Sequence, residues 1–369
     1  MEWTLWFSYI LLSFVVITLV HSLLLPNLSK IRRIEGVPLV SVLVPMRNEV
    51  RNVKGMVDSV KKQTYKHIEV FFLDDESTDG TSSALELAVR GDARFKVLQG
   101  KPKPEKWIGK VFACHQLSEA AKGDYLLFLD ADVRIQPEAV ERALGLMQQK
   151  NISLLSGFSR FILPTWLNKL LVPLQHFFVL FHLPILLANW TKWPPATAAH
   201  GGFMFFERSA YQAIGGHAVV KENIVEDVAI SKRMKAEGYR MWIANITSVA
   251  SCRMYETNAE VWQGFTKNIF NGIGRSIPLA VGIILFYGVV YVGSGILALA
   301  ALLVEERVLL LPYLLIILQA GIVYLNTREP LALAFLLPVA SVAFILLLVS
   351  AMRKSVKGQQ VEWKGRYYG

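Results

Sequence analysis

Apolar residues follow two patterns along this chain: long unbroken runs near both ends and short runs in the middle. The long runs are Trp3 to Leu25, Ile277 to Val304, Val308 to Leu325 and Leu331 to Val349. A helix needs roughly 20 apolar residues to cross a bilayer, and each of these runs has about that length. The pattern predicts membrane-spanning helices at both ends of the chain.

The middle of the chain alternates short apolar runs with helix-like segments. Leu39 to Pro45 and Ile68 to Leu73 are predicted strands, and helical patterns follow up to Gln63 and over Ser82 to Val89. A strand, helix, strand order with polar residues at the strand ends is typical of a nucleotide-binding α/β domain. The glycine-rich phosphate motifs of P-loop and dinucleotide-binding proteins are missing from the sequence. A nucleotide would therefore be held by side chains and a metal ion.

A third predicted strand begins at Tyr125 and stops on Asp130 and Asp132. Ligands of parallel sheets bind at the carboxyl ends of the strands, and alternate residues of an extended chain point the same way. Both carboxylates could then face one hard cation such as Mg²⁺ or Mn²⁺. An isolated Asp-x-Asp is more often a solvated turn, so this interpretation depends on the neighbouring motifs.

Composition narrows the class of protein. Hydrophobic residues make up 53% of the 369 residues and the mean hydropathy is +0.38, which is too apolar for an ordinary soluble enzyme. The net charge of +10 comes from scattered basic residues without a nucleic-acid-binding module, so an anionic membrane surface is the expected partner rather than nucleic acid. The two cysteines, Cys114 and Cys252, predict neither a disulfide framework nor a zinc site.

Charges next to the apolar runs predict the topology. Lys30, Arg32 and Arg33 follow the first run, no signal-peptide cleavage site is evident, and positive charges favour the cytoplasm. Three further crossings would place the basic tail, which contains Arg353 and Lys354, outside. One C-terminal run would then be re-entrant or interfacial, and the sequence does not say which.

Three blocks of residues resemble one known family. Ser41 to Glu49, the stretch from Asp74 to Thr81, and Asp130-Ala131-Asp132 are similar in order and spacing to the nucleotide-sugar half of the family 2 glycosyltransferases, which have the GT-A fold. The resemblance implies that Asp75 binds uracil. It also implies metal binding by Asp132 beside Asp130, and a nucleoside pocket lined by Pro45, Arg47 and Glu49.

Lys110 ends a basic, proline-rich loop and starts a predicted helix over Val111 to Ala121. Helix N-terminal amides and an ammonium group can together hold a diphosphate, whereas Lys101, Lys103 and Lys106 are as easily explained as a solvated loop. The sequence Trp-x-Gly-Lys also resembles a subgroup of family 2 enzymes that act on membrane isoprenoids.

Glu226 and Asp227 precede a predicted helix over Ile230 to Glu237. By itself an acidic pair here is typical of N-terminal capping. The resemblance instead makes Asp227 the catalytic base with Glu226 as its neighbour. Upstream, His200 and Gly201 open a glycine-containing block that suits an acceptor or diphosphate wall.

The remaining motifs concern the acceptor. Residues 161–190 are predicted to be amphipathic segments on the cytoplasmic face, with core helices as an equal alternative. Trp262 and Lys267 lie where processive synthases carry Gln-x-x-Arg-Trp, but the Arg-Trp pair is missing, which argues against polymer synthesis. The tail resembles that of bacterial carotenoid glucosyltransferases, and a cytoplasmic tail would let Trp363 and Arg366 close over the donor.

The sequence therefore predicts an anchor over 1–26, a cytoplasmic GT-A domain with a mixed central sheet over 27–276, a membrane region over 277–351 and a basic tail over 352–369. The expected reaction is inverting transfer of a hexose, with glucose favoured, from a UDP-sugar to a membrane lipid such as a carotenoid or isoprenoid acid or alcohol. Diacylglycerol, a ceramide-like lipid or polyprenyl phosphate are alternative acceptors. The alternative functions are a processive polysaccharide synthase and a catalytically silent membrane scaffold.

Overall fold

The computed structural model describes residues 2–29, 34–359, 361–363 and 366–368, the last two segments by their backbone only. The chain divides into two compact units. One, called the sheet unit here, comprises Leu25–Ile162 and Pro184–Met254. The other, the helical unit, comprises Met1–Leu24, Leu163–Leu183 and Tyr255–Gly369.

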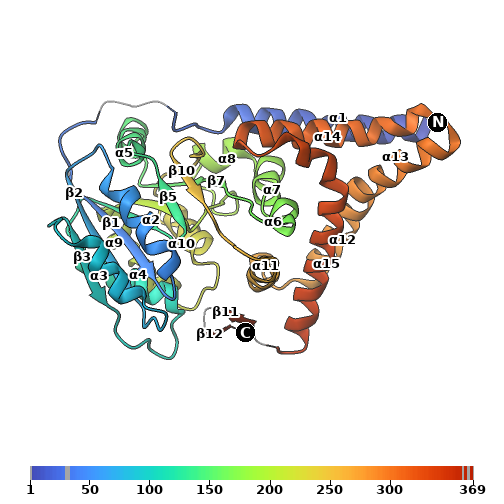
Figure 1. Ribbon diagram of the computed structural model, residues 1–369. Coiled ribbons are helices and arrows are strands. Elements are labelled where there is room, and N and C mark those ends of the chain that lie inside the picture. The colour runs from blue at the N-terminus through green and yellow to red at the C-terminus, as the bar shows by residue number, and fades with distance from the viewer. Residues whose placement is uncertain (1, 30–33, 360, 364–365, 369) are drawn as a thin grey trace. The chain divides into compact units, whose positions relative to one another are not determined.

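The sheet unit alternates strands and helices, as the sequence pattern predicts (Figure 1). Its elements are β1 (Val40–Met46), α2 (Val50–Lys61), β2 (Ile68–Asp74), α3 (Thr81–Val89), β3 (Phe95–Gln99), α4 (Gly109–Ala120), β4 (Tyr125–Leu129), β5 (Val133–Ile135), α5 (Ala139–Lys150), β6 (Leu154–Phe158), β7 (Arg160–Phe161), α8 (Ile185–Trp190), β8 (Phe203–Glu207), α9 (Arg208–Ala213), the 3₁₀ helix η1 (Gly216–Val220), α10 (Glu226–Ala236), β9 (Met241–Asn245) and β10 (Ala250–Cys252).

The main sheet has seven strands in the order β3-β2-β1-β4-β8-β6-β9. The first four are parallel, and β8 runs antiparallel to both β4 and β6. Strands β1 and β4 are apolar and almost wholly buried because helices cover the sheet, α4 among them. A second sheet joins β5, β10 and β7. The predicted α/β class with a mixed central sheet is therefore confirmed.

The helical unit contains α1 (Glu2–Leu24), α6 (Trp166–Leu171), α7 (Leu174–His182), α11 (Asn258–Gly272), α12 (Ile277–Tyr287), the π segment η2 (Gly288–Val292), α13 (Gly293–Val304), η3 (Arg307–Leu310), α14 (Leu311–Thr327), η4 (Leu331–Leu336), α15 (Leu337–Val356), β11 (Val361–Trp363) and β12 (Arg366–Tyr368). Four stretches of helix in the described residues are long and apolar enough to cross a membrane, and they match the four predicted runs: Glu2–Leu24, Ile277–Val304, Arg307–Thr327 and Leu331–Val356.

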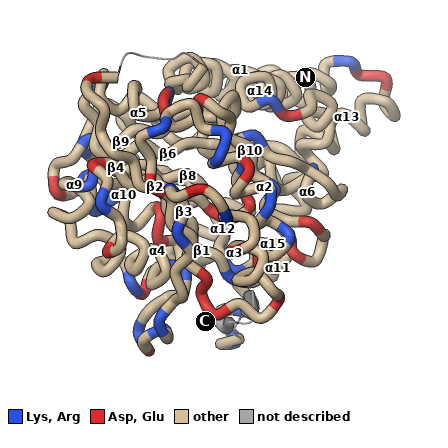
Figure 2. The backbone as a smooth tube through the Cα atoms, turned by 60° about the vertical axis from the view of Figure 1, so that its left-hand side comes forward, with Lys and Arg blue, Asp and Glu red and all other residues tan. Residues whose placement is uncertain are grey.

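Helices α1 and α14 pack side by side along their lengths, and both are almost free of charged residues (Figure 2). Buried hydrogen bonds connect α14 to α1 and to η2. The Gln319 side-chain amide donates to Thr18 Oγ1 at 3.0 Å, and the Tyr291 hydroxyl donates to Gln319 at 3.2 Å. Such hydrogen bonds hold helices together where apolar burial alone cannot specify a partner.

The units do not follow the predicted domain boundaries residue for residue. Residues 163–183, expected on the catalytic domain, and the stretch from Tyr255 to 276 both group with the helical unit. Helix α8, at the end of the predicted amphipathic region, belongs to the sheet unit. Whether these segments lie on a membrane surface stays a prediction.

Candidate functional site: an ammonium group among three carboxylates

The carboxyl end of the main sheet carries a cluster of charged side chains centred on Lys110. Lys110, in the first turn of α4, places its Nζ atom 2.7 Å from Asp130 Oδ1 and 2.9 Å from Glu226 Oε1. Asp130 follows β4 directly, and Glu226 is the first residue of α10. Three segments that are distant in the sequence, the farthest two being 116 residues apart, thus meet at one ammonium group. Although burial opposes the charge on Lys110, the two carboxylates raise its pKa well above the usual value.

Asp227 joins this cluster through a backbone contact with Gly201. The Gly201 amide donates to Asp227 Oδ2 at 2.8 Å, and the Val228 amide donates to Oδ1 at 2.8 Å. A Cβ atom at position 201 would lie 3.0 Å from Lys110 Nζ and 3.4 Å from Asp227 Oδ2. A larger residue would therefore crowd the two side chains, and glycine lets the backbone approach the cluster closely.

The charges around Asp227 tune its acidity. Burial and then the neighbouring Glu226 raise the pKa of Asp227 to about 7, while Lys110 and the two amide donors act in the opposite direction. A carboxyl group with a pKa near neutrality can accept a proton during a reaction and release it afterwards.

A cavity of about 10 Å³, enough for one water molecule, lies beside the cluster. Pro45 and Asp130 line it together with Lys110 and Asp227. The predicted nucleoside residue Pro45 is therefore close to the predicted base, as one continuous donor site requires.

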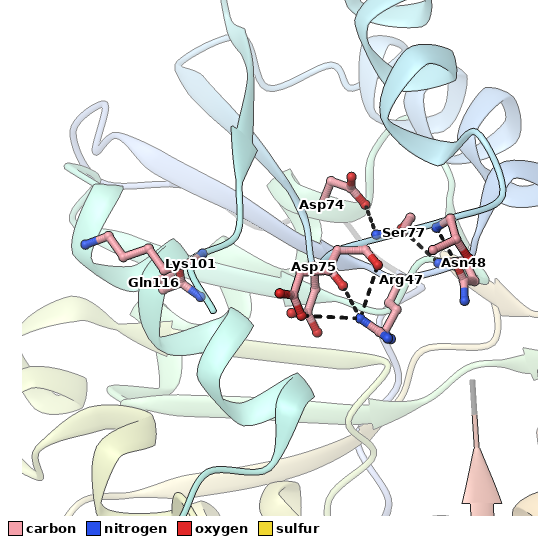
Figure 3. Close-up of polar contacts among 9 residues, drawn as sticks. Arg47, Asn48, Asp74, Asp75, Ser77, Lys101 and Gln116 are labelled. Atoms are coloured by element: carbon pink, nitrogen blue, oxygen red, sulfur yellow. Dashed lines mark hydrogen bonds and ion pairs between the residues drawn. The ribbon is translucent and has the colours of Figure 1, made fainter. Parts of the chain in front are cut away.

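The ends of β1 and β2 form the other side of this edge (Figure 3). Asp75 is 3% exposed, and its backbone amide donates to Met46. The Arg47 guanidinium donates to the backbone oxygens of Asp75 at 2.5 Å and Glu76 at 3.3 Å, so it crosses from one strand end to the other. The predicted residues Arg47 and Asp75 therefore lie together.

Glu49 is buried, and its role differs from that of an open pocket wall. Its backbone amide donates to Thr81 Oγ1, and its carboxylate accepts from the Asn52 side chain at 2.7 Å. Asn52 in turn accepts a hydrogen bond from Arg134 at 2.7 Å. Glu49 thus anchors the start of α2 to β5, which positions the strand end that carries Arg47.

Asp132 lies on a turn rather than on the predicted strand, because β4 ends at Leu129 and the Val133 amide bonds back to the Asp130 carbonyl. Its carboxylate accepts a hydrogen bond from the buried Cys252 thiol. Burial, followed by the charges of Asp132 and Asp130, raises the pKa of that thiol. Both cysteines are free and buried, in agreement with the predicted lack of a disulfide.

No group of three or more His, Cys, Asp or Glu residues converges on one metal position among the described residues. This does not argue against a catalytic cation, since Mg²⁺ in phosphate-transfer sites takes one or two carboxylates and completes its shell with substrate phosphates and water. Two hard carboxylates at one strand end fit that kind of donor set.

The other predicted site residues fall into three groups. His200 is 8% exposed and donates its amide to Ser156 Oγ at 2.9 Å, so it supports the Gly201 turn. Trp262 and Lys267 lie on α11 of the helical unit. The side chains of Trp363 and Arg366 lie outside the described part of the chain.

Two residues that connect separate segments of the sheet unit were not predicted from the sequence. Arg134 links β5 to α2, as described above. Lys235, on the same helix as Asp227, is 2% exposed and donates to the carbonyls of Ala188 and Ala196, each at 2.6 Å. No local signal distinguishes Lys235 from the neighbouring exposed lysine at position 232.

This fold is that of the GT-A glycosyltransferases. Residues 41–215 match the model of glycosyl transferase family 2, so the chain carries a family 2 glycosyltransferase domain and is a transferase enzyme.

Among curated proteins, the chain is 25% identical over 262 residues to the 4,4'-diaponeurosporenoate glycosyltransferase of Staphylococcus haemolyticus, covering 68% of this chain and 66% of that protein. It is 24% identical over 342 residues to the protein of the same name in Staphylococcus aureus, covering 89% and 88%. Among solved structures, it is similar in fold to the mannosyltransferase PcManGT of Pyrobaculum calidifontis in complex with GDP-Man and Mn²⁺. The TM-score is 0.50 at 17% identity, over 95% of this chain and 99% of that one.

Proposed function

We propose that this enzyme transfers a hexose, with glucose as the leading sugar, from a UDP-sugar to a membrane lipid, and that a carotenoid or related isoprenoid acid or alcohol is the leading acceptor. The cluster of Lys110, Asp130, Glu226 and Asp227 at the edge of a GT-A sheet carries the proposal. The four apolar helices and the names of the two staphylococcal relatives support a lipid acceptor.

The base in this mechanism is Asp227. The acceptor oxygen attacks the anomeric carbon in line, the bond from that carbon to UDP breaks, and Asp227 takes the proton of a hydroxyl acceptor. Inversion at the anomeric carbon follows from the single displacement. A pKa near 7 suits this step because the carboxylate is available at neutral pH and still binds a proton well. Gly201 holds the Asp227 carboxylate in place through its amide.

Donor binding is assigned to the strand ends. Asp75 would accept a hydrogen bond from uracil, with Pro45 and Arg47 beside the nucleoside and Glu49 bracing the strand end. Lys110 lies within 3 Å of two carboxylates in the structure. When the donor binds, its ammonium group would move toward the diphosphate, because that group offers further negatively charged oxygens. Asp130 would remain close to the donor phosphates.

Asp132, with Asp130 beside it, would hold Mg²⁺ or Mn²⁺ together with the donor diphosphate. When bound, the cation would supply positive charge to the departing UDP. The fit rests on the two carboxylates of the turn after β4 and on the preference of such cations for oxygen ligands. The mannosyltransferase of similar fold was solved with Mn²⁺.

The acceptor wall and the topology complete the proposal. We assign His200 and Gly201 to the wall next to the base, and Trp262 and Lys267 to sugar and phosphate contacts during acceptor entry. Trp363 and Arg366 would close over the donor from a cytoplasmic tail. The cations at positions 30, 32 and 33 put the sheet unit in the cytoplasm, next to the supply of nucleotide sugars and an anionic lipid surface.

Mass spectrometry of total lipids from cells with and without the gene tests the reaction. Our proposal predicts one discrete new glycolipid whose mass identifies the acceptor and shows that one hexose was added, and hydrolysis followed by sugar analysis then names the hexose. A polysaccharide ladder would instead support a processive synthase. An unchanged lipid profile in cells that supply a carotenoid acid, an isoprenoid alcohol and diacylglycerol would contradict the proposal.

A further inference from the structure

The segment from α8 to Trp193 exposes a dense group of large apolar side chains on the sheet unit. The exposed fractions are 53% for Leu186, 39% for Leu187, 48% for Trp190 and 53% for Trp193. We call these four residues the Trp190 patch. Lys192 is exposed between the two tryptophans. Single exposed apolar residues are common, but four within eight positions indicate a surface that meets an apolar partner.

Buried hydrogen bonds attach the segment that carries the patch to the edge of the main sheet. Strand β9 is the last strand of the sheet. The Asn189 side-chain amide donates to the Ile243 carbonyl at 3.0 Å and accepts from the Ile243 amide at 2.8 Å. Asn189 thereby satisfies the open edge of β9 as another strand would. The Trp190 ring also packs on the buried Trp242 ring, with centroids 4.9 Å apart.

Lys235 supports the segment that carries the patch. Its ammonium group donates to the carbonyls of Ala188 and Ala196, one on each side of Trp190 and Trp193. The segment is therefore fixed at both ends, and its exposed apolar side chains are held outward by specific contacts.

The same edge of β9 receives the chain directly after the first predicted span. The Asn245 amide donates to Pro26 and the Asn245 carbonyl accepts from Leu28, and α1 ends at Leu24. Residues two apart on a strand direct their backbone groups to the same side, and the rise is about 3.3 Å per residue. Ile243, which is hydrogen-bonded to Asn189, thus lies roughly 7 Å along the strand from Asn245, the residue that pairs with Pro26 and Leu28.

We propose that the Trp190 patch is a lipid-binding surface that sits in the interfacial layer of the membrane spanned by α1. Tryptophan rings favour the head-group region, leucine side chains enter the acyl boundary, and Lys192 can pair with anionic head groups. The patch would fix the height of the sheet unit above the lipid. The inference rests on the proposed membrane attachment.

Site-directed spin labelling of the full chain in lipid nanodiscs tests this inference. A nitroxide at Leu187→Cys is compared with labels at Leu12→Cys, in the middle of α1, and at Leu87→Cys, an equally apolar position that is 66% exposed on α3 of the same sheet unit. The native Cys114 and Cys252 are each 2% exposed, so the wild-type chain measures background labelling. Collision rates with oxygen and with a water-soluble nickel chelate report depth in the bilayer.

We expect the label at 187 to show a ratio of oxygen to nickel collisions between those at 12 and 87, and clearly above that at 87. A ratio at 187 equal to that at 87, with the label at 12 deep in lipid, would overturn the patch and leave the proposed function standing. Water-like ratios at 12 as well would overturn membrane attachment itself. Dipolar broadening at 187 that disappears on dilution with unlabelled chain would assign the patch to a second copy and overturn lipid binding.

A kinetic experiment gives an independent readout. The double variant Leu187→Ser/Trp193→Ser should raise the apparent KM for an acceptor embedded in vesicles several-fold and leave the KM for UDP-glucose unchanged. The matched control is Leu87→Ser. An equal rise with a detergent-dispersed acceptor would mean that the patch shapes the active site and not the membrane contact, and would refute the inference.

Discussion

Each unit places a basic side chain against acidic ones, but the number of acidic partners and the exposure to solvent differ. In the sheet unit Lys110 contacts Asp130 and Glu226, and these three side chains keep 35%, 32% and 12% of their surface exposed. In the helical unit His176 contacts Glu329 at 3.0 Å, and both side chains are fully buried. The first group has more acids than bases and is open to solvent, so a ligand can change its pairing. The second is matched one to one and closed, which suits a structural contact between α7 and the end of α14.

This difference predicts that substitutions in the two groups separate activity from stability. Changes at the open cluster should remove transfer and leave the fold intact. Changes at the closed pair should lower stability and spare the chemistry of molecules that remain folded.

The largest effect is expected for Asp132→Ala. Loss of this carboxylate should abolish transfer, because the proposed cation would lose its main protein ligand. The fold should persist because the substitution removes one of two neighbouring like charges. Calorimetric titration of UDP with and without Mn²⁺ should show cation-dependent binding in the wild type and none in the variant.

Asp58→Ala, an exposed acid on α2, is the matched control and should retain both activity and binding. Full activity of the wild type in excess EDTA would show that no divalent cation is needed.

The next effect concerns Asp227→Asn, which keeps the shape of the side chain and removes its basicity. A hydroxyl acceptor must lose a proton as it attacks, so turnover should fall by about 10² to 10⁴. A carboxylic acid has a pKa near 4 and arrives ionised, so the loss should be smaller. Purified enzyme, UDP-glucose and each acceptor in micelles give the comparison, with Glu222→Gln, an exposed acid upstream of α10, as control.

The pH profile sharpens the same test. Since the pKa of Asp227 is raised to about 7, kcat/KM for a hydroxyl acceptor should fall as the pH drops below 7 and the carboxylate becomes protonated. The Asp227→Asn variant should not show this fall in kcat/KM below pH 7. Near wild-type turnover of a hydroxyl acceptor by Asp227→Asn would show that another group is the base.

The sequence predicted those features that depend on neighbours along the chain. Apolar runs gave the four long helices, and the strand, helix, strand order gave the α/β class, because both patterns are local. Asp130, Asp132, Glu226 and Asp227 were found at the starts or ends of elements, where polar residues follow or precede apolar runs.

Contacts between distant segments were not predictable in the same way. The pairing of Lys110 with Glu226 joins positions 116 residues apart. The turn after Leu129 and the contacts of Asp130 with Lys110 and of Asp132 with Cys252 also depend on distant segments, while the shared cation of the two carboxylates stays a prediction. The assignment of α6 and α7 to the helical unit likewise depends on packing, which the periodicity of apolar residues along the chain does not show.

In the helical unit, Glu329→Ala should destabilise the protein by about 3 kcal/mol, because it leaves His176 buried without this carboxylate. Thermal unfolding in detergent measures the loss, and transfer per folded molecule should remain near the wild-type value. Glu306→Ala, an exposed acid in another loop between predicted spans, is the control. An unchanged melting temperature would mean that the buried pair contributes little to the stability of the helical unit.

The smallest expected effect concerns Lys235, whose ammonium group is buried in the sheet unit and donates to two backbone carbonyls. Burial lowers the pKa of Lys235 to about 8. An unfolded chain has a lysine pKa of about 10.4, so between these values the unfolded state binds a proton that the native state lacks, and native stability must rise with pH. A neutral amine still has two N–H donors for Ala188 and Ala196, so the loop should stay braced. The unfolding free energy of the wild type should therefore increase by up to about 2 kcal/mol from pH 8 to 9.5 relative to Lys235→Met, which cannot titrate. Parallel melts of both proteins at each pH cancel the titration of all other groups, and a constant difference would show that Lys235 keeps an ordinary pKa.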